Sequence, residues 1–169
     1  YWTPMSESKK PGHVLVFFPF ADFPDWTRFV EGILRSVQPD IEFVMWTYNW
    51  GWAPDEDRIQ FVRNIPDRVI LEATFEMFEK IQREGLAISI ADYSVVFPGP
   101  GHYFTTEAAA AKECGRRLYA MTNTGGRSWD LGVIPYDPVP YLWKKRWDAI
   151  LAAHRDWGLS GLMESHHYG

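Results

Sequence analysis

Carboxyl and imidazole groups follow several apolar runs of this sequence, at positions where predicted strands end. Glu164 closes the last run, "LSGLME", and His166 and His167 come two and three residues later. Asp92 and Glu72 lie near the ends of two earlier runs. Two carboxyl groups at one edge of a sheet can share acid–base catalysis, in which one donates a proton and the other acts as base or nucleophile. We therefore predict Glu164 and Asp92 as catalytic residues; the alternative is that Glu72 is exposed and Asp92 caps a loop.

Aromatic rings are the broadest signal in the chain. Phe, Trp and Tyr make up 17% of the residues, so some rings are expected on a working surface, where their faces bind flat apolar ligands, sugars or cations. The alternative is that half of these rings belong to the core. The predicted binding residues combine rings with hydrogen-bonding groups near strand ends, and they are Trp46, Tyr48, Asn49, Trp50, Asn123, Trp129, Asp130, His166 and His167.

We predict no bound metal and no cofactor. Imidazole and carboxylate are usual metal ligands, but adjacent histidines in a strand point to opposite faces, so His166 and His167 do not readily share one site. A hydrogen bond to a substrate or within a loop is the interpretation we favour. The run "TGGRSWDLG" lacks the lysine and the glycine spacing of phosphate-binding loops, which argues against nucleotide binding. Cys114 is the single cysteine, so there is no disulfide framework.

The composition argues against two further classes of partner. A net charge of -5 with dispersed basic residues does not suit a nucleic-acid groove. No apolar run approaches the about 20 residues of a membrane span.

Hydrophobic residues make up 46% of the 169, which is enough for one domain with a sizeable core. We predict a polar lead-in at 1–12 and a single domain at 13–169.

Strand-like and helix-like runs alternate along that domain. Apolar or β-branched runs predict strands at 13–20, 41–50, 68–75, 86–96, 118–123 and 159–164. Helical spacing predicts helices at 25–40, 105–117 and 141–158. The run 76–85 is either a helix or one arm of a hairpin, and we favour the helix. Such alternation predicts an α/β fold with a parallel sheet, whose ligand lies at the carboxyl ends of the strands.

Two of the predicted helices carry apolar stripes. In the helix at 25–40, the stripe is Phe29, Ile33 and Val37, and we expect this face to be buried. In the helix at 141–158, the stripe that we expect to be buried consists of Trp143, Trp147, Ile150, Leu151 and His154 or Trp157.

Four stretches carry a resemblance to a known family. They are "EFVMWTYNWGW" (42–52), "ADYSVVFPGPG" (91–101), "YAMTNTGGRSWDLGVIPYDPVPYLW" (119–143) and "GLMESHHYG" (161–169). Together they resemble the C-terminal half of a (β/α)8 barrel in large bacterial proteins similar to glycoside hydrolases, which are distantly akin to the family 20 β-hexosaminidases. The resemblance implies a partial TIM-type barrel, because about six predicted strands are too few for a typical barrel of about 250 residues.

The same resemblance implies a carbohydrate ligand and a role for the last strand. Glu164 stands where the hexosaminidases carry a glutamate that holds sugar hydroxyls, although the neighbouring tryptophan of that family is missing here. The family's adjacent Asp-Glu pair has no counterpart at a predicted strand end. The missing N-terminal part of a larger chain is therefore an expected partner. A carbohydrate-binding module without catalysis and a metal-dependent barrel hydrolase are the two alternatives.

Overall fold

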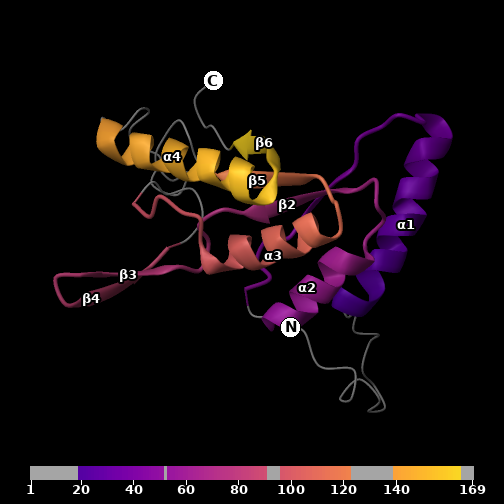
Figure 1. The fold of residues 1–169 in the computed structure, drawn as a ribbon. Coiled ribbons are helices and arrows are strands. Elements are labelled where there is room, and N and C mark those ends of the chain that lie inside the picture. Colours follow the sequence, from indigo (N-terminus) through magenta and orange to yellow (C-terminus); the bar gives the residue numbers. More distant parts are fainter. Residues whose placement is uncertain (1–18, 52, 91–95, 123–138, 165–169) are drawn as a thin grey trace, which may run out of the picture.

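A computed structural model describes residues 19–51, 53–90, 96–122 and 139–164. In chain order the elements are α1 (Pro19–Val37), β1 (Val44–Trp46), α2 (Asp55–Asn64), β2 (Ile70–Thr74), β3 (Lys80–Arg83), β4 (Leu86–Ser89), α3 (His102–Glu113), β5 (Leu118–Thr122), α4 (Pro140–Trp157) and β6 (Leu159–Glu164) (Figure 1). The chain is thus an α/β protein, as predicted.

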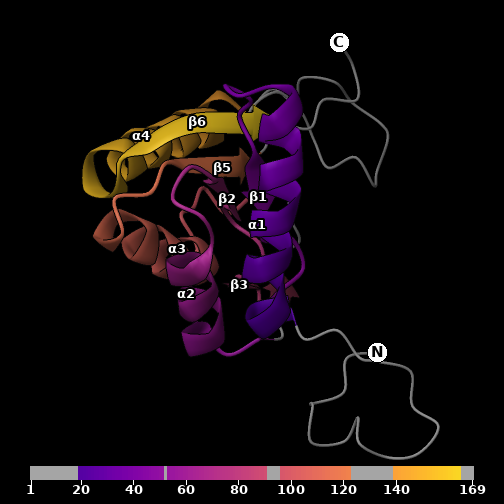
Figure 2. The ribbon, with the colours of Figure 1, turned by 90° about the vertical axis from the view of Figure 1, so that its right-hand side faces the viewer.

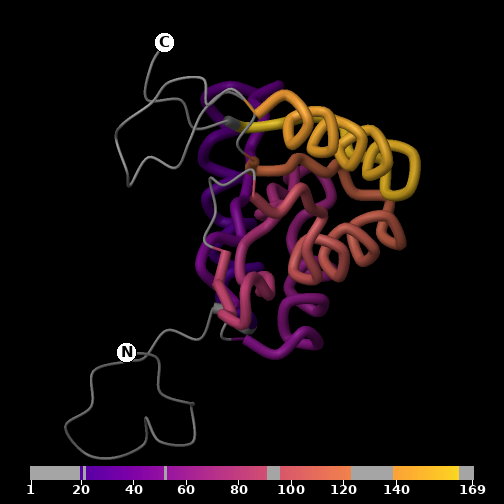
Figure 3. Tube along the Cα trace, turned by 90° about the vertical axis from the view of Figure 1, so that its left-hand side faces the viewer, coloured from indigo at the N-terminus to yellow at the C-terminus, as the bar shows by residue number. Residues whose placement is uncertain are grey.

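Four strands form one parallel sheet in the order β1-β2-β5-β6. Each new strand is added on the same side of the preceding one, so the strand order never reverses. Helices α4, α3 and α2 follow one another along the molecule as a row, and α1 stands apart from that row (Figures 2 and 3). The predicted strands at 41–50, 68–75, 118–123 and 159–164 are confirmed by this sheet, although four strands do not close a barrel.

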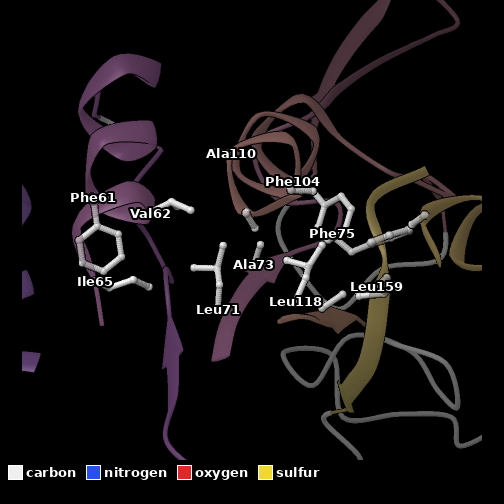
Figure 4. Packing of buried hydrophobic residues seen from close by; sticks show 14 of the residues in the cluster. Phe61, Val62, Ile65, Leu71, Ala73, Phe75, Phe104, Ala110, Leu118 and Leu159 are labelled. Carbon is white, nitrogen blue, oxygen red and sulfur yellow. The ribbon is translucent and has the colours of Figure 1, made fainter. Parts of the chain in front are cut away.

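One face of the sheet packs against the row formed by α2, α3 and α4. Leu71 and Ala73 of β2, and Phe75 directly after it, join a single apolar cluster with Phe61 of α2 and Phe104 of α3 (Figure 4). All five side chains are fully buried. Because successive strand residues point to opposite faces, the other residues of β2 belong to the face away from the cluster. We call this second surface the opposite face.

Local sequence signals explain where the helices begin and end. Helix α2 carries three acidic residues in its first turn, which suit the positive end of the helix dipole, and it ends before Ile65, whose extended backbone precedes Pro66. Helix α4 begins with Pro140 in its first turn and ends at Gly158, which has the left-handed φ of 73°.

The predicted helix at 76–85 is wrong, because the run forms a hairpin. Strands β3 and β4 pair antiparallel, with Arg83 opposite Leu86. Glu84 and Gly85 make the two-residue turn with φ values of 52° and 79°, the positive angles that a type I′ turn requires. Of the predicted strand at 86–96, Leu86–Ser89 form β4 of this hairpin and not a strand of the parallel sheet, while residues 91–95 lie outside the described residues. The hairpin projects from the body of the protein (Figure 1).

The expected apolar stripes of the two helices are largely exposed. Val37 is 81% exposed and Phe29 66%, and Ile33 on the same side of α1 is also exposed. In α4 the buried positions include Ile150 and Ala153, while Trp147 and Leu151 are exposed. Helix α1 begins six residues earlier than predicted, at Pro19, and packs through Phe20 against α2 and Trp50 instead. Residues 13–18 of the predicted first strand lie outside the described residues.

Within the described part of the chain, no helix is long and apolar enough to cross a membrane.

Candidate functional site

The register of the sheet brings an aromatic ring and a carboxyl group together on the opposite face. Trp46 at the end of β1 pairs with Glu72 in β2, so the two residues are neighbours across adjacent strands. Paired residues of neighbouring strands point to the same side, and Thr74, two residues after Glu72, shares it. Tyr48 follows β1, and its ring lies 4.4 Å from the Trp46 ring, measured between centroids, at an interplanar angle of 34°. We call Trp46, Tyr48, Glu72 and Thr74 the Glu72 site.

Glu72 is deeply buried, so the alternative that it is exposed is wrong. Its exposed fraction is 1%. Burial raises the pKa of its carboxyl group from 4.5 to about 7, because the charged form is the one that loses solvation. Glu72 therefore keeps its proton through the weakly acidic range. Among the strand side chains that the structure describes, Glu72 is the only carboxyl group on the parallel sheet.

Three polar atoms of this site find no hydrogen-bond partner in the described part of the chain. They are Oε1 of Glu72, Oγ1 of Thr74 and the indole Nε1 of Trp46, and all three are buried. Buried polar groups in proteins are almost always paired, since an unpaired one costs about 1–3 kcal/mol. Three such atoms on two adjacent strands are therefore unusual.

The other register neighbour of Glu72, Tyr119, does not provide its carboxyl group with a hydrogen-bond partner. Tyr119 of β5 pairs with Glu72 on one side and Gly161 of β6 on the other. A Cβ atom at Gly161 would lie 2.5 Å from the Tyr119 ring, so that ring extends over β6. Its hydroxyl group accepts a hydrogen bond from Arg117 at 3.0 Å. Tyr119 is therefore directed away from Glu72.

Two buried ion pairs hold the helix-covered face near the carboxyl ends of the strands. Arg58 of α2 donates to Glu107 of α3 at 2.9 Å, and Thr47 Oγ1, just after β1, donates to the other oxygen of Glu107 at 2.6 Å. Arg146 of α4 donates to Glu76, which follows β2, at 2.5 Å. Burial raises the pKa of Glu107 to about 7, against the lowering effects of Thr47 and Arg58. These pairs connect helices to strand ends and thereby fix the edge that carries Trp46 and Thr74.

Trp50, a predicted binding residue, belongs to the core. Its ring contacts Phe61 at 4.8 Å and Phe20 at 5.1 Å between centroids, both edge to face. The alternative that some rings are core residues therefore applies to Trp50. Asn49, another predicted binding residue, is exposed and has the left-handed φ of 61°, which asparagine tolerates better than most residues. It serves the turn that follows β1.

Replacing Trp50 with alanine is expected to lower the free energy of unfolding by about 2–3 kcal/mol, because it removes a half-buried ring from three aromatic contacts. Urea unfolding measures this change. The half-exposed Trp26 on α1 is the matched control, with an expected loss of less than about 1 kcal/mol on the same substitution. Equal losses at the two positions would contradict the assignment of Trp50 to the core.

The backbone of Glu164 lies at the end of β6, level with Thr122 of β5. Glu72 is level with Gly161, so Glu164 stands two strands and three residues away from it. The side chain of Glu164 lies outside the described part of the structure, as do Asp92, Asn123, Trp129, Asp130, His166 and His167. Of the predicted site residues, the structure thus brings Trp46 and Tyr48 together.

Two residues of the Glu72 site were not among the predicted site residues, namely Glu72 and Thr74. Glu72 was considered as a carboxyl group near the end of a predicted strand, but the structure places it in the middle of β2. A carboxyl group in the middle of the apolar run "VILEATF" has to be buried if the run is a central strand, and this is the signal that points to it. Thr74 carries no such signal, because β-branched threonine is common in strands.

Among the described residues, no three His, Cys, Asp or Glu side chains are grouped as metal ligands. Comparison of the chain with protein-family models, with curated proteins and with solved structures returned no match.

Proposed function

We propose that this chain is a carbohydrate-active domain that binds a sugar at the carboxyl ends of its parallel strands and hydrolyses a glycosidic bond there. The observation that carries the proposal is the pairing of Trp46 with the buried Glu72 on one face of the sheet. The aromatic pair of Trp46 and Tyr48 provides an apolar surface for a pyranose ring, and ligands of parallel α/β sheets bind at this end of the strands.

Glu72 has the properties of the proton donor. A general acid for glycoside hydrolysis has to be protonated near neutral pH, and carboxyl groups with a raised pKa perform this role in such enzymes. The pKa of about 7 meets this requirement. Its proton passes to the leaving oxygen as the bond from that oxygen to the sugar carbon breaks, and a water molecule adds to the carbon while the proton that it loses passes to a second carboxylate. Glu164 and Asp92 are our candidates for the second carboxylate that the reaction needs.

The proposal includes a barrel of which this sheet forms part. Strands added in one direction, with their crossover helices on one side, are the winding of a (β/α)8 barrel, whereas doubly wound sheets reverse their order. β6 is the last strand in the order β1-β2-β5-β6, and a groove of about 230 Å³ lined by Ile150, Leu159 and Leu162, among others, lies between it and α4. The partner that we propose for the outer edge of β6 is another part of a larger chain.

One observation favours a second candidate function, a sugar-binding module without catalysis. Glu72 stands alone as a carboxyl group among the described side chains of the parallel strands, and hydrolysis requires two. The aromatic pair and the polar atoms beside it would bind a sugar equally well without turnover.

A single assay with two readouts separates these functions. Incubation of the protein with cello-, xylo- and chito-oligosaccharides measures reducing-end release, and tryptophan fluorescence measures binding. We expect the Glu72→Gln substitution to lower kcat at least a hundredfold while binding is retained, and Glu42→Gln, an exposed carboxyl group in an ion pair with Arg117, to leave kcat unchanged. Binding without turnover in the unmodified protein supports the binding module, and an absence of both readouts contradicts the proposal.

A further inference from the structure

We propose that Thr74 Oγ1, Trp46 Nε1 and the Glu72 carboxyl group form one hydrogen-bonding set that receives the hydroxyl groups of a single sugar ring. This inference rests on the proposed function and names the residues that would set its specificity. Thr74 Oγ1, Trp46 Nε1 and Oε1 of Glu72 are each buried and lack a partner in the described part of the chain.

The three residues are neighbours within and across adjacent strands, close enough together for one small ligand to reach all of them. Trp46 and Glu72 are register partners, so their Cα atoms are about 5 Å apart, and Glu72 and Thr74 are separated by about 7 Å along β2. All three side chains leave the same face of the sheet. A monosaccharide ring spans such distances and carries hydroxyl groups around its rim.

The chemistry of the three groups selects a ligand rich in hydroxyl groups. The indole N–H only donates, the threonine hydroxyl donates and accepts, and a protonated carboxyl group does both. A hydroxyl group can satisfy each of these, since it is itself both donor and acceptor. A carboxylate or phosphate ligand would accept from all three but would also bring a negative charge beside a buried acid, which is unfavourable.

The three groups differ from a threonine hydroxyl group whose role in the fold is evident. Thr47 is hydrogen-bonded to Glu107 and to the carbonyl oxygen of Glu72. Thr74 is fully buried and pairs with none of the described residues. Polar atoms that serve to contact a ligand are expected to lack partners within the fold, at a cost to the stability of the protein.

Substitution of Thr74 by valine tests the inference, because valine keeps the shape of the side chain and removes the hydroxyl group. We expect the dissociation constant for the bound oligosaccharide, followed through the Trp46 indole N–H signal by nuclear magnetic resonance, to rise about fivefold to tenfold. In the absence of sugar we expect the Tm of the same variant to rise by a few degrees, since an unpaired buried hydroxyl group is gone. A residue that merely supports the fold would not combine these two changes.

Thr27→Val is the matched control. Thr27 is also fully buried and its hydroxyl group also lacks a partner among the described residues, but it lies on α1, which packs on α2. We expect it to raise the Tm and to leave sugar affinity unchanged.

Three results would count against the inference. Unchanged affinity in Thr74→Val, together with binding by the unmodified protein, overturns the inference and leaves the proposed function standing. An equal loss of affinity in Thr27→Val assigns the effect to the fold as a whole and also overturns it. An absence of sugar binding in the unmodified protein overturns the proposed function, and this inference with it.

Discussion

Replacement of Arg58 by methionine is expected to lower the free energy of unfolding by about 3–5 kcal/mol. The side chains of Arg58 and Glu107 are 3% and 0% exposed, and the guanidinium group also lies 4.0 Å above the centre of the Tyr103 ring and pairs with Asp55. Methionine fills much of the space but leaves the Glu107 carboxyl group buried without its countercharge, which is the costly way to break such a pair. Equilibrium urea unfolding measures the loss.

A second ion pair between the same two helices provides the control for this prediction. Arg63 of α2 contacts Glu113 of α3 at 3.1 Å, but both side chains are well exposed, at 41% and 63%. Arg63→Met is therefore expected to cost less than about 1 kcal/mol. The double substitution of Arg58→Met with Glu107→Gln removes both charges and is expected to recover most of the stability. If Arg58→Met proves as mild as Arg63→Met, the pair does not hold α2 to α3.

The elements that sequence reasoning predicted best are those whose local signals agree with their surroundings. β2 and β5 are mostly apolar and buried, with Glu72 and the threonines at their ends as polar exceptions, because helices cover one face and the sheet is parallel, and α4 has Pro140 and Gly158 at its ends. The run 76–85 was predicted as a helix because Gly85 can end a helix, but a glycine can equally complete a two-residue hairpin turn. The pairing of Arg83 with Leu86 across the turn decides between these, and pairing depends on contacts that short-range patterns do not contain.

The site was predictable by residue type but not by register. Trp46 and Tyr48 were recognisable as rings near a strand end. Their position beside Glu72, however, depends on the alignment of β1 with β2. A shift of one residue would move Glu72 to the helix-covered face. Trp50 was also recognisable as a ring near a strand end, but it lies beyond β1, four positions after Trp46, and packs against Phe61 in the core. Spacing along the chain therefore identified candidate residues, and strand pairing selected among them.

The stability difference between the Glu72→Gln variant and the unmodified protein is expected to depend strongly on pH. The pKa of Glu72 is raised from 4.5 to about 7 in the folded protein. Below the lower value the carboxyl group is protonated whether the chain is folded or not, so its contribution to stability is complete. That contribution is lost as the pH rises through 7, because folding then has to bury a charge. The size of this loss is about 3 kcal/mol.

Glutamine does not titrate, so the variant is expected to gain about 3 kcal/mol relative to the unmodified protein between pH 4.5 and pH 8. Urea unfolding at several pH values measures this difference. The pKa of Glu107 is also raised, but its contribution to the pH dependence is the same in both proteins and cancels in the difference. Glu113→Gln, which replaces an exposed carboxyl group on α3, is the control. Its stability difference from the unmodified protein is expected to vary by less than about 0.5 kcal/mol over that pH range. A flat difference for Glu72→Gln would mean that the carboxyl group is solvated, and a solvated Glu72 would not hold its proton near neutral pH as the proposed acid must.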